Sequence, residues 1–165
     1  MSPEAGRAGA DALQHFAGGD VELALRLFVT TVLAVAIGAE REFHGHPAGI
    51  RTMALVGVGS CLFTALGVLT VFGMDPTRIA AQIVTGVGFL GAGSILRQGN
   101  EVRGLTTAAS IWVVAAIGMA VGFGFYVTAI FTTVLVMVTL VLIRPLERRM
   151  FRRHAARGPD ETEIS

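Results

Sequence analysis

The sequence predicts an all-α, polytopic membrane protein with five transmembrane helices. Hydrophobic side chains make up 53% of the 165 residues, only 15% are charged, and the mean hydropathy is +0.66, which is too apolar for a soluble domain. A first apolar run, residues 21–39, holds only Glu22 and Arg26 as charged residues. Four further runs hold none: residues 53–73, 79–96, 105–122 and 125–143. Because about 20 apolar residues cross a hydrocarbon core of ~30 Å, each run is long enough to span a membrane.

Residues 1–20 precede the first predicted span and contain acids, glycines and few apolar residues. They lack the basic and then apolar pattern of a cleaved signal peptide. We therefore expect an extracytoplasmic segment, followed by a first span that serves as its own insertion signal. Asp20 is expected to cap the first helix. Glu22 and Arg26, four residues apart, are expected to form an ion pair that orients the helix end.

The arginines predict the orientation of the chain, because short cytoplasmic connections are rich in basic residues. All 13 basic residues are arginine. Ten lie after the first span, after the third span or in the tail, residues 144–165, whereas only Arg7, Arg26 and Arg78 lie on the other side. The pattern places the N-terminus outside, the domain of residues 21–143 in the membrane and the C-terminus in the cytoplasm. The tail is expected to form a short basic helix that binds anionic lipid.

Two groups of polar side chains are predicted at the cytoplasmic ends of the spans, one in each arginine-bearing connection. Arg51 borders an apolar run, so its guanidinium is expected to reach the headgroups or to pair with Glu40 or Glu42. We interpret the two groups as one candidate functional face, and the alternative is that they only determine topology. The face comprises Glu40, Arg41, Glu42, Arg51, Thr52, Arg97, Arg103, Gly104, Thr106 and Thr107.

Both groups contain the pattern G-[IL]-x-T-x-A, which begins at Gly49 and again at Gly104. Each copy opens a predicted span after an arginine-bearing connection, so the two helical hairpins that contain the copies would have the same orientation. They would then form a parallel internal repeat. Since the match is short, chance stays open as the alternative.

Glycines mark the third span as the expected centre of the bundle. At ~100° per residue, Gly86 and Gly93 lie on one side of a helix and Gly88 and Gly91 on nearly the opposite side. Small residues on two faces let two neighbouring helices approach closely, which leaves a homo-oligomer open. The dinucleotide pattern G-x-G-x-x-G at Gly86 is disfavoured, because it requires a preceding strand. Six glycines are predicted to serve helix packing or a partner interface: Gly86, Gly88, Gly91, Gly93, Gly118 and Gly122.

No residue pattern predicts catalysis, a cofactor or nucleic-acid binding. His44 and His46 lie near Glu42, a combination that would suit a metal ion, but the adjoining glycine and proline favour a turn, and we expect no metal site. Cys61 is expected to be a small, buried packing residue.

The run GVGFLGAGSILRQGNEVRGLTTAASIWVVAAIGMAVG, with GAERE and GIRTMALVGVGS upstream, resembles the membrane domain of the MgtC/SapB family. The resemblance covers residues 21–143. It implies a bacterial inner-membrane protein linked to survival in low magnesium and, in some members, to virulence inside host phagocytes. Many members have Asn in place of Thr106, so a virulence role that depends on that amide is not implied here. Some members also carry a cytoplasmic ACT-like domain, whose function we expect to be absent or supplied by another protein.

Two functions are open. Magnesium prefers oxygen ligands, usually carboxylates, so a transporter should have acidic or amide groups at membrane depth. The second to fifth predicted spans contain no acid and offer only the amide of Gln82 and hydroxyl groups, which disfavours transport by a monomer but leaves a carbonyl-lined oligomer open. The resemblance implies a different role, because family members inhibit the rotary ATP synthase and affect membrane potential and cytoplasmic pH. We therefore expect a modulator of such a complex, with magnesium transport as the alternative.

Overall fold

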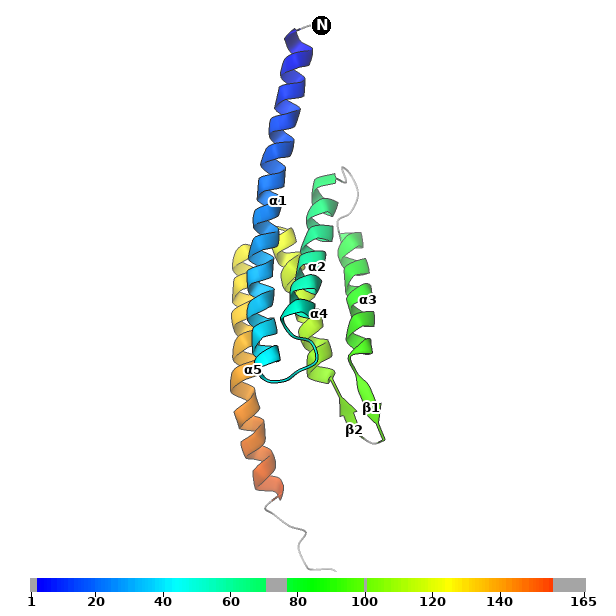
Figure 1. Cartoon of the computed structure of the whole chain (residues 1–165), viewed down its shortest axis with the longest axis vertical. Helices are drawn as coiled ribbons and strands as arrows, with labels where there is room; N and C mark the ends of the chain where they lie inside the picture. Colours follow the sequence, from blue (N-terminus) through cyan, green and yellow to red (C-terminus); the bar gives the residue numbers. More distant parts are fainter. Residues whose placement is uncertain (1–2, 71–76, 100, 156–165) are drawn as a thin grey trace, which may run out of the picture.

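The structure is a computed structural model that describes residues 3–70, 77–99 and 101–155, with side chains over residues 19–68, 77–99 and 101–142. The predicted all-α fold is confirmed (Figure 1). The described helices are α1 (Pro3–Phe43), α2 (Ile50–Thr70), α3 (Thr77–Gly93), α4 (Leu105–Gly122) and α5 (Tyr126–Ala155). By length and composition, three described stretches can cross a membrane: Gly19–Phe43, Ile50–Val68 and Leu105–Gly122. The apolar part of α5, Tyr126–Leu142, is shorter, and α3 has 17 residues.

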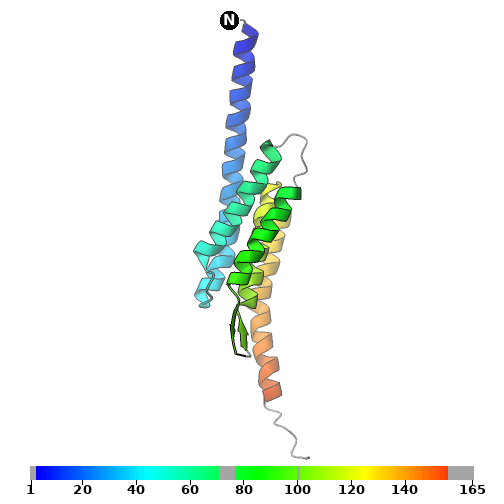
Figure 2. The same cartoon turned by 90° about the vertical axis from the view of Figure 1, so that its right-hand side faces the viewer.

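Helix α4, and not α3, is the centre of the bundle. It packs against each of the other four helices and buries Val114, Ile117 and Val121. Helix α3 lies at the edge, where it packs mainly on α4 and buries only Val87 and Gly91 (Figure 1, Figure 2). The prediction of a central third span is therefore wrong, because glycines on two helix faces permit close packing without requiring it.

The contact between α2 and α4 is a backbone contact. A Cβ atom added at Gly118 would lie 2.3 Å from the carbonyl oxygen of Gly57, and one at Gly122 would lie 2.8 Å from that of Cys61. Both distances are shorter than any tolerated carbon–oxygen contact, so only glycine fits at these two positions of α4. Cys61 is a free and buried residue, as predicted.

The second arginine-bearing connection, between α3 and α4, is a two-stranded hairpin. Strands β1 (Leu96–Gln98) and β2 (Glu101–Arg103) are antiparallel, with Gln98 paired to Glu101. Gly99 has a φ of 61°, a value typical of tight hairpin turns. Gly104, after β2, has a φ of 92°, and a Cβ there would lie 2.0 Å from the carbonyl oxygen of Ser94. Glycine is thus required where the hairpin joins α4.

Two helices extend beyond their predicted limits. Helix α1 begins at Pro3, so Asp20 lies inside it and the predicted N-cap is wrong. The alanines among residues 5–17 favour a helix, although Gly18 and Gly19 do not, and no proline follows Pro3 to end it before Asp20. Helix α5 continues to Ala155, so its backbone joins the fifth predicted span to the basic tail without a break. The arginine side chains of the tail, and hence its predicted lipid contacts, lie outside the described residues.

The arginine-bearing connections lie at one end of the bundle, together with the C-terminal end of α5 (Figure 1). We call it the hairpin end, defined by residues 40–51, 96–99 and 101–107. The predicted orientation requires these segments to share one side of the membrane. That this side is cytoplasmic stays a prediction.

Candidate functional site

Arg41 is the buried centre of the hairpin end. It belongs to the last turn of α1, and only 1% of its surface is exposed. Its Nη2 atom donates a hydrogen bond to the hydroxyl of Thr107, in the first turn of α4, over 2.5 Å. A hydrogen bond that involves a charged group contributes about 1.5–3 kcal/mol. Arg41 therefore ties the C-terminal end of α1 to the N-terminal end of α4.

Glu40 is also buried, with 8% of its surface exposed. Its Oε1 lies 3.0 Å from Nδ1 of His44, and the same nitrogen lies 2.8 Å from the Glu40 backbone carbonyl oxygen. Its other carboxylate oxygen, Oε2, is buried without a hydrogen-bond partner among the described residues. The hairpin end thus contains a carboxylate and a guanidinium on adjacent residues, both shielded from solvent.

Glu42 caps the next helix. Its carboxylate accepts a 2.9 Å hydrogen bond from the backbone N–H of Ile50, the first residue of α2. A negative group at a helix N-terminus satisfies a free donor and complements the helix dipole. Arg51 is exposed and forms no ion pair with Glu40 or Glu42 among the described residues, so of the two expectations for it only a guanidinium that reaches the headgroups stays a prediction. The physical reason is that α2 and His44 already engage the two carboxylates.

The second predicted group is largely exposed. On the hairpin, Arg103 donates to Glu101 over 3.0 Å, and Arg97 donates to the carbonyl oxygen of Gly99 over 3.1 Å. Thr106 is exposed, whereas its neighbour Thr107 is buried against Arg41. The hydrogen bond from Arg41 to Thr107 therefore joins the two predicted groups.

The repeated pattern does not produce two equal sites. Its threonine is Thr52 in the first copy and Thr107 in the second. Thr52 is exposed on α2, and Thr107 is buried. The same short pattern thus occurs in two different environments.

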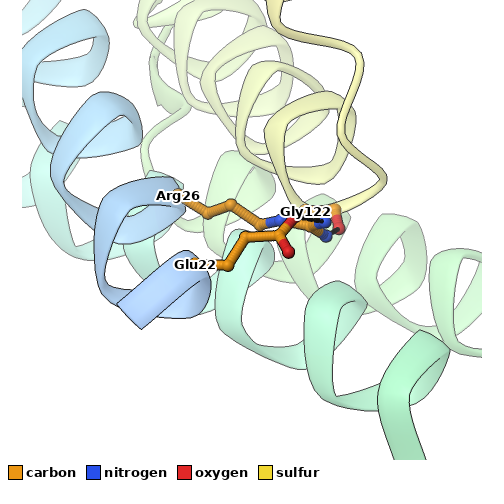
Figure 3. Close-up of polar contacts among 3 residues, drawn as sticks. All are labelled: Glu22, Arg26 and Gly122. Carbon is orange, nitrogen blue, oxygen red and sulfur yellow. Dashed lines mark hydrogen bonds and ion pairs between the residues drawn. The ribbon is translucent and has the colours of Figure 1, made fainter. Parts of the chain in front are cut away.

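A second arginine, Arg26, holds α1 at the opposite end of α4 (Figure 3). Its Nη1 atom donates a 2.5 Å hydrogen bond to the carbonyl oxygen of Gly122, and its Nη2 atom pairs with Glu22. The Glu22–Arg26 ion pair was predicted, but the contact with α4 was not. The last carbonyl groups of a helix lack intrahelical partners, so Arg26 satisfies one at the end of α4.

The two arginine contacts match in spacing. Fifteen residues separate Arg26 from Arg41, and fifteen separate Thr107 from Gly122. At 1.5 Å per residue both pairs span about 22 Å, so the antiparallel helices α1 and α4 meet at both ends of α4. The equal spacing in the sequence could have predicted these two contacts only if α4 were already known to be the partner of α1.

The family model for the MgtC family matches residues 27–149. The chain belongs to the MgtC family. It is 44% identical over 141 residues to YhiD of Escherichia coli K12, a protein named provisionally as a magnesium transporter; the match covers 81% of this chain and 66% of YhiD. It is 44% identical over 126 residues to the protein MgtC of Salmonella typhimurium LT2, covering 76% of this chain and 54% of that protein. No solved structure matches the chain.

Membership of the MgtC family, together with the apolar helices, makes this chain a multi-pass protein of the bacterial inner membrane. It spans about half to two thirds of the length of these relatives. The region that matches the MgtC family includes Arg41, Thr107 and the α2–α4 contact. Arg26 lies one residue before the matched region.

Proposed function

We propose that this MgtC-family protein modulates another complex of the inner membrane, with a rotary ATP synthase as the expected partner, during adaptation to low magnesium. The observation that carries the proposal is an unoccupied helix-packing face on α3. Four small residues spaced four, three and four apart lie exposed on one side of the helix, and a Cβ at the glycine would meet no atom within 4 Å. We call them the small-residue face: Ala81, Thr85, Gly88 and Ala92.

Small residues have a specific use inside a membrane. Lipid tails are as apolar as leucine, so helices associate by close van der Waals packing, which small side chains allow. The small-residue face borders the contact with α4, because Gly91, one turn from Gly88, lies against Ala108 of α4. Its own four residues are exposed. A transmembrane helix of a partner complex would fit against it.

The hairpin supports the same proposal outside the hydrocarbon core. It continues directly from α3 and exposes Arg97 and Arg103 at the hairpin end. Charged side chains at the rim of an interface provide specificity and steering more than affinity. The small-residue face and the hairpin therefore form one surface for a partner with a transmembrane helix and acidic polar regions. This role needs no chemical step, and we assign no catalytic residue.

The proposal predicts the effect of Gly88→Leu on partner binding. The leucine would fill the small-residue face without a clash inside the chain, since nothing lies within 4 Å of its Cβ. Loss of this close helix contact is expected to lower the affinity about tenfold, which corresponds to about 1.4 kcal/mol of binding free energy. Affinity-tagged full chain is expected to co-purify ATP synthase from mild detergent, and Gly88→Leu to recover about tenfold less.

Gly86→Leu is the matched control, because Gly86 lies on another side of α3 and also has no atom within 4 Å of its Cβ position. It is expected to recover as much ATP synthase as the unchanged protein. Equal recovery by Gly88→Leu would contradict the proposal. So would an equal loss with both variants.

Magnesium transport is the alternative, favoured by the name given to YhiD. Among the described residues, no group of three or more His, Cys, Asp or Glu side chains is placed to hold a metal ion. At the hairpin end, the buried carboxylate of Glu40 beside His44 is a group that could serve as a cation ligand. Saturable magnesium uptake by proteoliposomes that contain only this chain would favour the alternative.

A further inference from the structure

A groove of about 820 Å³ runs between α2 and α3. Its walls are mostly apolar, and large side chains such as Leu55, Phe63 and Leu90 line it while staying exposed. Gly59 on α2 and Gly86 on α3 widen it, because a Cβ at either position would meet no atom within 4 Å. The groove exists because α3 packs mainly on α4 and only weakly on α2.

The end of the groove away from the hairpin is charged. Arg78 and Gln82, on successive turns of α3, line that end. Arg78 is exposed, and it has no ion pair with an acid among the described residues. A guanidinium at the mouth of an apolar groove favours a ligand with an anionic head and an apolar body.

The length of the groove matches one leaflet of a bilayer. Twelve residues of α3 separate Arg78 from Leu90, which corresponds to about 18 Å. The hydrocarbon core is about 30 Å thick, so one leaflet is about half of that. A helix 18 Å long and about 10 Å wide would occupy about 1,400 Å³, so it could enter this open groove only in part. A single hydrocarbon chain is much thinner than a helix.

We propose that the groove binds one anionic phospholipid, with an acyl chain between α2 and α3 and the phosphate at Arg78. The charge at one end, the apolar walls and the length of one leaflet carry the assignment. The inference does not depend on the proposed function, because the small-residue face lies on another side of α3. The site is also distinct from the C-terminal end of α5, which is at the other end of the bundle (Figure 1).

Native mass spectrometry of the full chain tests the proposal, with phosphatidylglycerol and phosphatidylcholine of identical acyl chains added in separate titrations. We expect one phosphatidylglycerol bound about tenfold more tightly than phosphatidylcholine. Gly86→Leu should block the groove and weaken binding of both lipids by about tenfold or more. Arg78→Gln should weaken only phosphatidylglycerol, which removes the preference. Gly88→Leu, on the small-residue face, should bind both lipids as the unchanged chain does.

Circular dichroism of each variant establishes that it is folded before the lipid affinities are compared. Unchanged lipid binding by Gly86→Leu would overturn the proposal. Equal binding of the two lipids by the unchanged chain, or an unaltered preference in Arg78→Gln, would overturn the role of Arg78. If the unchanged chain were a dimer that Gly86→Leu converts to a monomer, the occupant would be a second copy and the lipid assignment would be wrong.

Discussion

Gly118→Ala is expected to lower the free energy of unfolding by about 3 kcal/mol, at the upper end of the range for overpacked cores. The added Cβ would lie 2.3 Å from the carbonyl oxygen of Gly57. Because the obstructing atom belongs to the backbone of α2, no side-chain rotation can relieve the clash, and α2 and α4 must move apart. Thermal unfolding of the purified protein in detergent, followed by circular dichroism, measures the change.

Gly88→Ala provides the control, with an expected effect of opposite sign. No atom lies within 4 Å of its Cβ position, and alanine is favoured over glycine in a helix by about 0.5–1 kcal/mol. We expect this variant to match or slightly exceed the stability of the unchanged protein. If Gly118→Ala were as stable as Gly88→Ala, the α2–α4 contact at Gly57 would be looser than the structure describes.

Arg41→Ala is expected to destabilise the protein by about 3 kcal/mol, through the lost hydrogen bond and the cavity that remains. Thr107→Val should cost about 2 kcal/mol, because it removes the acceptor and leaves the buried charge in place. The double variant should lose less than the two single losses together, since both changes remove the same contact. The same thermal unfolding assay measures all three.

Arg51→Ala is the control for Arg41, because Arg51 is exposed at the same end of the bundle. Its effect is expected to stay within about 0.5 kcal/mol. If Arg41→Ala lost no more stability than Arg51→Ala, Arg41 would not hold α1 against α4. Additive losses in the Arg41 and Thr107 variants would lead to the same conclusion.

The helices could be predicted because their cause is local. Runs without charge that match the thickness of a membrane predicted α2, α4 and the apolar part of α5 closely. Glu22 and Arg26, one turn apart, were also predicted to pair, and they do. The hairpin was missed although a local signal was present, since Gly99-Asn100 between two three-residue segments is a two-residue turn pattern.

The packing could not be predicted, because its causes are distant in the sequence. Arg41 meets Thr107 across 66 residues, and Arg26 meets Gly122 across 96. Glycines are ambiguous for a related reason. The backbone of α2 occupies the space beside Gly118, whereas the space beside Gly88 is open. Only the position of a neighbouring helix distinguishes the two glycines.

ATP-driven proton pumping is a direct measure of whether the chain modulates ATP synthase. Lipid vesicles would contain purified ATP synthase with or without an excess of the full chain, and a pH-sensitive dye would report acidification. We expect the unchanged chain and Gly86→Leu to slow acidification. Gly88→Leu, which fills the small-residue face, is expected to leave the rate unchanged. An acidification rate that is the same with and without the unchanged chain would contradict the proposed modulation of the synthase.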